Sequence, residues 1–334
     1  MKRLVIGIAL VIALVGLAAC GGNKSAEPAS GSAGSGYTIA VIPKGTSHAF
    51  WQSIRAGGER AGRELGVTVI WRGPLREDDR DSQVSEVEGF VSRGVSGIVL
   101  APLDESALVQ PVAEAGRKKI PVVIFDSGLK GEGYVSFVAT DNIKGGRLGG
   151  ERLAQSLGGK GKVILLRYAE GHDSTGKREQ GFLDAMKANP GIEVVSSNQY
   201  AGADVEGAYK KAEAILNTYK KPDGSLGIDG IFAANESSSF ALLRVLQDNG
   251  WAGKVKFVGF DASPNLVKGL RDGGIDGLVV QDPVRMGYTA VQTMVAHLKG
   301  QPVEKWIDTG VHVATKENMA TPEIKALLEP DLSK

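Results

Sequence analysis

The sequence contains one cysteine, Cys20, among 334 residues. A lone cysteine excludes an internal disulfide. Neither sign of charge is in excess, because 39 Lys and Arg face 38 Asp and Glu. Such a balance argues against a nucleic-acid partner. After the first twenty residues no apolar run is long enough to span a membrane, and the mean hydropathy of the chain is −0.06.

Signatures of catalysis and of metal binding are also missing. There is no Gly-x-Ser-x-Gly elbow for a hydrolase, and the four histidines show no metal-ligand spacing. The stretch from Gly171 to Arg178 is close to a phosphate-binding loop, but Arg178 replaces the Ser or Thr that would hold magnesium. Asp126 and Asp261 could in principle act as a glycosidase pair, but if they lie on opposite lobes of the protein, binding of hydroxyl groups suits them better. We therefore expect no enzyme, no cofactor and no metal.

The first twenty residues have the pattern of a targeting segment. Lys2 and Arg3 precede an apolar run over 4–17, which is short for a membrane span. The run ends Leu-Ala-Ala-Cys, which resembles a bacterial lipoprotein signal. We expect residues 1–20 to form a signal peptide that ends at a lipidated Cys20, which anchors the protein to a membrane. The alternative is a chance cysteine in an ordinary secretory signal.

Residues 21–36 are rich in Gly, Ser and Ala, which predicts a flexible tether between the anchor and a folded body. Cleavage before Cys20 would remove two of the basic residues, Lys2 and Arg3, and leave 37 basic against 38 acidic residues. The exported body is therefore expected to be nearly neutral.

From about residue 37 to 330, short apolar runs alternate with amphipathic stretches. The expected strands are 38–42, 67–71, 97–100, 122–125, 135–138, 162–166, 193–195, 230–233, 256–260 and 277–280. The expected helices include 82–93, 105–118, 178–188, 205–219 and 238–249. Continuous apolar strands that alternate with helices indicate parallel sheets covered on both faces. The length favours two α/β domains with about five strands in each sheet.

The stretch 38–65 combines a strand, a polar loop and the start of a helix. In such units ligands bind beyond the carboxyl ends of the strands. The loop here carries Lys44, Thr46, Ser47 and His48, and Phe50 and Trp51 follow on the first helical turn. One interpretation buries Phe50 and leaves Trp51 on the surface. The other places at least one ring over a cleft, where it stacks on a flat apolar face of a ligand.

Polar residues follow several of the later strands. Asp126, Asn235, Asp261 and Gln281 each lie at the carboxyl end of a strand, which is the edge where a cleft is expected. Each has a structural alternative, since Asp126 and Asn235 are good helix N-caps and Asp261 is a good turn residue. Their common position, together with the aromatic pair, favours a polar binding site.

Several segments, in this order and spacing, resemble the ribose-type periplasmic sugar-binding proteins of ATP-binding-cassette importers. They are IAVI at 39–42 followed by FWQSIRAG at 50–57, PVVIFDS at 121–127, VATDNIKGG at 138–146, KREQGF at 177–182, IFAANESSSFALLRVL at 231–246 and FVGFDASP at 257–264. The resemblance implies a type I periplasmic binding protein fold, with two similar doubly wound parallel-sheet lobes and a three-strand hinge. It places 37–140 plus 282–309 in the N-terminal lobe and 141–281 plus 310–334 in the C-terminal lobe.

The resemblance also implies the ligand contacts. The residues that match the family's site are His48, Phe50, Trp51, Asp126, Ser127, Arg178, Asn235, Asp261 and Gln281. Two of these depart from the pattern. Ser127 stands where the ribose binders often have Arg, and the family's binding arginine aligns either with Arg178 or with Gly176. The identity of the sugar therefore stays open.

The implied function is capture of a sugar and its delivery to the permease subunits of an importer. Carboxylates and amides bind pairs of hydroxyls, and aromatic rings cover the C–H face of a sugar. We expect a monomer in the periplasm or on the outer face of the cell membrane. The alternatives keep the fold but bind a polyol, nucleoside, furanose signal or amino acid, or make the protein a ligand sensor for a membrane partner. Thr46 and Ser47 are a weak sign of a ledge for an amino-acid carboxylate.

Overall fold

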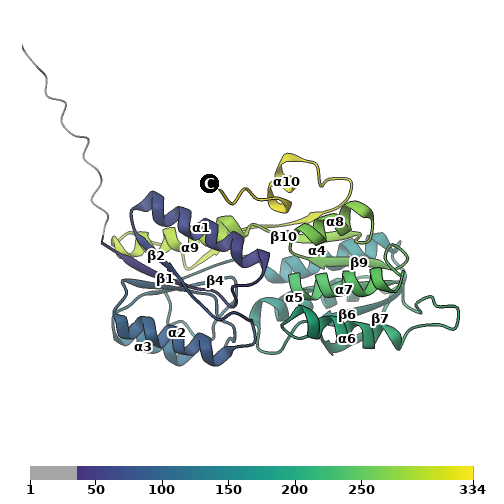
Figure 1. Cartoon of the computed structure of the whole chain (residues 1–334), viewed down its shortest axis with the longest axis horizontal. Helices are drawn as coiled ribbons and strands as arrows, with labels where there is room; N and C mark the ends of the chain where they lie inside the picture. Colours follow the sequence, from purple (N-terminus) through teal and green to yellow (C-terminus); the bar gives the residue numbers. More distant parts are fainter. Residues whose placement is uncertain (1–35, 334) are drawn as a thin grey trace, which may run out of the picture. The chain divides into compact units, whose positions relative to one another are not determined.

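The computed structural model describes residues 36–333, so the predicted signal peptide with Cys20 and nearly all of the tether lie outside the described residues. Two six-stranded sheets, each covered by helices, form two α/β lobes, which confirms the predicted fold class (Figure 1). The first sheet has the order β11-β5-β4-β3-β1-β2, and the second has β12-β10-β9-β8-β6-β7. Within 36–333 no helix is both long and apolar enough to cross a membrane.

The first lobe combines the N-terminal part of the chain with a later return. Its elements are β1 (Thr38–Ile42), α1 (Ala49–Leu65), β2 (Thr68–Trp71), α2 (Arg80–Arg93), β3 (Gly97–Leu100), α3 (Val109–Arg117), β4 (Val122–Phe125), β5 (Ser136–Ala139), α9 (Pro283–Leu298) and β11 (Trp306–Asp308).

The second lobe contains the middle and the C-terminal end. Its elements are α4 (Asn142–Ser156), β6 (Gly161–Arg167), α5 (Asp173–Lys187), β7 (Ile192–Tyr200), α6 (Val205–Asn217), β8 (Gly230–Ala233), α7 (Glu236–Asp248), β9 (Lys256–Phe260), α8 (Pro264–Asp272), β10 (Gly277–Gln281), β12 (Val311–Ala314) and α10 (Pro322–Leu328). The described chain passes between the lobes after β5, after β10 and after β11.

Alternation of side chains along the strands builds a core on each face of each sheet. In β1, Ile39 and Val41 pack toward α1 and α9, whereas Ala40 and Ile42 pack toward α2 and α3. The second lobe repeats this plan, with α4 and α5 on one face of its sheet and α6, α7, α8 and α10 on the other (Figure 1). Strands that are buried on both faces explain the continuous apolar runs in the sequence.

Glycines allow two helix pairs to approach closely. A Cβ on Gly57 of α1 would lie 1.9 Å from the carbonyl oxygen of Val284, and one on Gly287 of α9 would lie 2.1 Å from that of Ile54. In the second lobe α4 and α5 approach equally closely, because a Cβ on Gly146 of α4 would lie 1.8 Å from the carbonyl oxygen of Arg178 in α5. In both lobes a small residue sets the position of a helix that begins beside the lobe boundary.

The edge strands differ from the sequence-based expectation. The prediction of about five strands in each sheet is one too few for each lobe, because the sequence did not predict β11 and β12. β12 pairs with β10 in the antiparallel direction, so the second sheet is not wholly parallel. As functional domains, the lobe ranges 37–140 plus 282–309 and 141–281 plus 310–334 stay a prediction.

Candidate ligand-binding site between the lobes

A cavity of about 30 Å³ lies between the lobes, and residues of both lobes line it. The predicted contact residues that line it are His48, Phe50, Trp51, Asp126, Arg178, Asn235, Asp261 and Gln281. Residues that were not predicted as contacts also line it: Lys44, Glu77, Ser174, Thr175 and Glu236. A single buried water needs roughly 10–15 Å³ by this measure, so the cavity has room for more than one water.

The aromatic pair lies at the start of α1, on the wall of the cavity. Phe50 and Trp51 are 8% and 2% exposed, so the interpretation that leaves Trp51 on the surface is wrong. Their rings meet edge to face with centroids 5.1 Å apart, and Trp51 also meets the ring of Phe125 at 6.3 Å. This packing fixes both rings before any ligand arrives.

Glu77, from the loop between β2 and α2, holds this wall together. One of its oxygens, Oε1, accepts from the indole nitrogen of Trp51 over 2.6 Å and lies 3.1 Å from Nδ1 of His48. The other oxygen accepts from the hydroxyl of Tyr168, which belongs to the second lobe, over 2.8 Å. Glu77 therefore joins the aromatic wall of the first lobe to the second lobe.

The surroundings of Glu77 keep it ionised. Burial alone would raise the pKa of Glu77, but the hydrogen bond and charge of His48, with the charge of Lys44, outweigh burial and lower the pKa to about 2. Burial would lower the pKa of His48, but the hydrogen bond and charge of Glu77 outweigh it and raise that pKa. The pair is thus favoured in its charged form.

Asp126 follows β4 and takes the left-handed backbone conformation, with φ 60°. Its amide donates to the carbonyl of Val138, and its carboxylate pairs with the ammonium of Lys44 over 2.8 Å. The next element is a strand, so the suggestion that Asp126 caps a helix is wrong. Ser127 does not line the cavity; its Oγ accepts from the amide of Ser174 in the second lobe over 3.1 Å.

Asp261 has the same backbone arrangement in the second lobe, with φ 70° and its amide bound to the carbonyl of Val279. Its carboxylate accepts from the amide of Glu236 over 3.1 Å and from Nε2 of Gln281 over 2.7 Å. Burial raises the pKa of Asp261, although the charge of Arg178, whose Nη1 lies 3.9 Å away, opposes that rise. Asp261 is a turn residue, and its side chain reaches the cavity.

Asn235 combines two roles that the sequence left as alternatives. It is the N-cap of α7, since Oδ1 accepts from the amide of Ser238 over 3.3 Å. Its side chain nevertheless lines the cavity. A helix cap at the end of β8 is therefore compatible with a place in the site.

Arg178 lines the cavity from α5, whereas Gly176 does not, so the structure favours Arg178 as the site arginine. Its guanidinium lies 3.9 Å from the centroid of the Phe260 ring, and its Nε donates to Oδ1 of Asn142 over 2.8 Å. Stacking and hydrogen bonding hold the group in one orientation. Its other donors are therefore presented in fixed directions.

Gln281, at the end of β10, has a buried side-chain oxygen that accepts no hydrogen bond within the described residues. The side chain is 3% exposed, and within residues 36–333 its Oε1 has no hydrogen-bond partner. Because Nε2 is committed to Asp261, the orientation of the amide is fixed. A buried acceptor without a partner costs about 1–3 kcal/mol, which a hydroxyl of a ligand would recover.

Glu236 is the first residue of α7 and has no ion-pair partner in the part of the chain that the structure describes. Its Oε2 accepts from the amide of Phe50, in the other lobe, over 3.2 Å. Burial raises the pKa of Glu236 to about 7. The charge of His48 and the hydrogen bond from the Phe50 amide lower this pKa, whereas the charges of Asp261 and Glu77 raise it further. This carboxyl group is therefore partly protonated near neutral pH.

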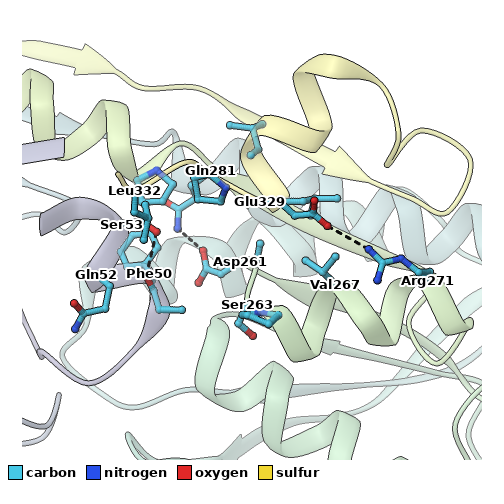
Figure 2. A pocket seen from close by; sticks show the side chains of 17 residues that line it. Phe50, Gln52, Ser53, Asp261, Ser263, Val267, Arg271, Gln281, Glu329 and Leu332 are labelled. Atoms are coloured by element: carbon cyan, nitrogen blue, oxygen red, sulfur yellow. Dashed lines mark hydrogen bonds and ion pairs between the residues drawn. The ribbon is translucent and has the colours of Figure 1, made fainter. Parts of the chain in front are cut away.

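A larger groove of about 510 Å³ adjoins this cavity (Figure 2). Phe50, Asp261 and Gln281 line both spaces, and at its far side Arg271 pairs with Glu329 over 3.2 Å. The rest of the groove is mostly apolar, with residues of α8 and of the C-terminal segment. The charged and amide groups gather in the small cavity, so we assign the candidate site to it. No group of acidic, histidine or cysteine side chains suited to a metal occurs within 36–333.

The chain is similar in sequence and in structure to known periplasmic and solute-binding proteins. Residues 39–302 match the family described as periplasmic binding protein domain. The chain is 30% identical to the ribose import binding protein of Haemophilus influenzae over 86% of this chain and 94% of that protein. It is 32% identical to the D-allose-binding periplasmic protein of Escherichia coli, over 80% of this chain and 86% of the other. A solute-binding protein of a carbohydrate transporter from Agrobacterium radiobacter, solved with D-arabinose, has a TM-score of 0.83 at 35% identity and covers 88% of this chain and 99% of its own.

Proposed function

Because this chain belongs to the periplasmic binding protein family, we propose that it captures a sugar between its two lobes and delivers it to an ATP-binding-cassette permease. The proposal rests on the polar cavity, to which both lobes contribute charged side chains. The relatives that bind ribose, allose and arabinose support a monosaccharide as the ligand.

The chemistry of the cavity suits a sugar. The carboxylates of Asp126 and Asp261 come from opposite lobes and can accept hydrogen bonds from the hydroxyl groups of a sugar. Arg178 can donate hydrogen bonds to hydroxyl oxygens. The free Oε1 of Gln281 takes one more hydroxyl. The rings of Phe50 and Trp51 supply an apolar surface for the C–H face. A sugar that leaves one of these buried groups unpaired would be rejected strongly.

The charges of the cavity favour a neutral ligand over an anionic one. Four carboxylates line it, those of Glu77, Asp126, Glu236 and Asp261, against the cations Lys44 and Arg178 and the imidazole of His48. With His48 charged and Glu236 partly protonated these charges nearly balance, so no surplus cation is left in the cavity to pair with a carboxylate or phosphate of a ligand. We therefore propose an uncharged monosaccharide or polyol rather than a sugar acid or sugar phosphate.

Binding without turnover is the proposed activity, as in a transport receptor. We further propose that the chain acts as a monomer outside the cytoplasmic membrane and is held there by a lipid on Cys20. The passages of the chain after β5, β10 and β11 are the proposed hinge. Because the cavity of about 30 Å³ has room for only a few waters, the lobes would have to part about this hinge to admit a sugar. Closure would then enclose it, and the closed form is the one that a permease would receive.

A thermal-shift screen followed by titration calorimetry tests the proposal. The panel contains D-ribose, D-allose, D-arabinose, D-fucose, D-tagatose and xylitol, with D-glucuronate as the anionic control. A true ligand at 100 times its dissociation constant stabilises the folded protein by about 2.7 kcal/mol. Absence of a shift with every neutral member, or a shift with D-glucuronate alone, would contradict the proposal.

A further inference from the structure

The loop after β4 and the start of α5 face each other across the boundary between the lobes. The amide of Gly128 donates to Oδ2 of Asp173 over 2.9 Å, and the amide of Ser174 donates to Oγ of Ser127 over 3.1 Å. Ser127 and Ser174 are 0% and 1% exposed. These four residues, which we call the α5 latch, form a contact that joins the two lobes.

Lys44 connects the α5 latch to the cavity. Its ammonium lies 2.8 Å from Oδ2 of Asp126 in its own lobe and donates to Oγ of Ser174 in the other lobe over 2.9 Å. Lys44 is 3% exposed, and both it and Asp126 line the cavity. One cation therefore touches a proposed sugar-binding carboxylate and a member of the latch at once.

We propose that Lys44 is a positioning residue that couples occupation of Asp126 to closure of the α5 latch. A lysine ammonium has three donors. Asp126 and Ser174 use two of them when the lobes are together. A sugar whose hydroxyls bind Asp126 fixes that carboxylate, and the carboxylate then holds Lys44 in the direction that meets Ser174.

The proposal rests on the proposed function and changes the role of one predicted contact. Ser127 was expected to touch the sugar, but it lies outside the cavity wall and binds Ser174. Gly128 lies outside the cavity wall and acts on the closed form whatever sugar is inside, whereas Ser174 also lines the cavity. Loss of the latch should therefore weaken every sugar by the same factor, whereas loss of a direct contact should change the order of preference.

Two variants open the latch without removing a charge from the cavity. Ser174→Ala deletes the hydroxyl that accepts from Lys44 and leaves its own amide in place. Gly128→Ala adds a Cβ at 2.7 Å from Oδ2 of Asp173, which conflicts only when the lobes meet. Gly116→Ala, in α3 of the same lobe, is the matched control, because its Cβ meets nothing within 4 Å.

Calorimetry and stopped-flow dissociation with D-ribose, D-allose and D-arabinose provide the test. Ser174→Ala and Gly128→Ala should each speed dissociation about fivefold to twentyfold for every sugar that binds, since a lost hydrogen bond is worth about 1 kcal/mol or more. Gly116→Ala should equal the parent protein. Dissociation rates within twofold of the parent in both latch variants, or a changed order of sugar preference in Gly128→Ala, would overturn the proposal.

A double-mutant cycle separates coupling from a general loss of structure. If Lys44 acts through Ser174, then Ser174→Ala should change dissociation by less than about twofold in a Lys44→Met background, because the pair is not independent. Fully additive effects would overturn the coupling. Lys44→Met also leaves Asp126 buried without its cation, so circular dichroism on that variant is needed first.

Failure of the latch and failure of the proposed function give different results. If no sugar of the panel stabilises the parent protein, the proposed function fails, and hydrogen exchange of the ligand-free protein tests the latch alone. The amide of Ser174 should then exchange about tenfold faster in Lys44→Met than in the parent. Equal exchange rates at Ser174 would contradict the latch even without a ligand.

Discussion

The amide of Phe50, at the start of α1, donates to Oε2 of Glu236, at the start of α7, over 3.2 Å. Phe50 belongs to the first lobe and Glu236 to the second, so the contact joins two helix starts across the cavity. A carboxylate suits the N-terminus of a helix, where amides are free and the dipole is positive. When the lobes are together, the carboxyl group of Glu236 is therefore partly buried and accepts one hydrogen bond from an uncharged donor, the amide of Phe50.

Affinity for a sugar should depend on pH through Glu236. Its pKa is about 7 in the structure, against an ordinary value of 4.5, because of burial. If opening exposes it, the closed form binds more protons between pH 4.5 and 7, so closure weakens as pH rises through that range and levels off above about 7. Because the group is not fully buried, we expect a loss of about tenfold from pH 5 to 8.

Calorimetry at several pH values measures this loss, and Glu236→Gln is the variant that should flatten the profile. His48, Asp261 and Glu77 also face Glu236. The pKa of His48 is raised, so its titration would act in the same direction and would remain in Glu236→Gln. An unchanged profile in Glu236→Gln would assign the pH dependence to His48 instead.

Asp261→Asn should weaken sugar binding without unfolding the protein. The change keeps the shape of the side chain and tolerates the left-handed backbone, but it replaces one acceptor oxygen by an NH2 donor and removes the charge. Hydrogen bonds to charged groups are worth about 1.5–3 kcal/mol, so affinity should fall about tenfold to a hundredfold or more. Calorimetry decides, with the melting temperature of the ligand-free variant as the check on folding.

Asp282→Asn is the matched control for Asp261→Asn. Asp282 follows the neighbouring strand and caps α9 by accepting from the amide of Arg285 over 2.9 Å. Asn caps a helix about as well as Asp, so this variant should bind sugar as the parent does. Equal losses in both variants would point to a general effect of charge and not to a contact at Asp261.

Closure should be visible in solution when the right sugar is added. The hinge motion should reduce the radius of gyration in small-angle scattering. It should also change tryptophan emission, because the indole of Trp51 binds Glu77, which in turn binds Tyr168 of the second lobe. Trp51→Phe should abolish the change in emission while the change in scattering persists. Constant scattering at saturating sugar would contradict the clamp.

Gly287→Ala should destabilise the first lobe. Its Cβ would lie 2.1 Å from the carbonyl oxygen of Ile54, so α9 would have to move away from α1. Overpacking of this kind costs about 1–3 kcal/mol or more, and we expect a melting temperature lower by several degrees. Gly116→Ala, with open space around it, should match or exceed the parent. A Gly287→Ala protein as stable as the parent would show that the helices separate freely.

Cys20→Ser should release the protein from the membrane. The motive is the Leu-Ala-Ala-Cys sequence that ends the apolar run. Without a lipid on residue 20 the variant should leave the membrane fraction, and its affinity for sugar should not change. Fractionation of cells with detection by antibody gives the answer. Equal membrane association of both forms would contradict the lipoprotein proposal.

The main elements of the fold were predictable because each central strand is an unbroken apolar run. The edge strands were not, since β11 has three residues and β12 has four, and their partners are distant in sequence. Pairing of Trp306 with Phe137 and of Val311 with Gln281 depends on how the lobes fold and not on a local pattern.

The family resemblance pointed to Arg178 on α5, and the structure places that residue at the cavity. The rule that ligands bind beyond the ends of strands found Asp126, Asn235, Asp261 and Gln281, which the structure brings together. It could not find Glu77, in a loop between a strand and a helix, or the contact from Tyr168, because these meet only when the lobes dock. Lys44 follows the first strand and was named at the rim, but its link to Ser174 has no signal in the sequence.

Asp126 and Asp261 hold the same place in the two sheets, after β4 and β9, and both have a positive φ. At such a point the backbone prefers glycine, and aspartate is one of the few other residues that adopt this conformation. Each lobe therefore has a carboxylate at the cavity on a backbone conformation that glycine would adopt more readily. Glycine at either position would relieve the backbone but remove a carboxylate from the cavity, so stability and binding make opposite demands at the same point of both lobes.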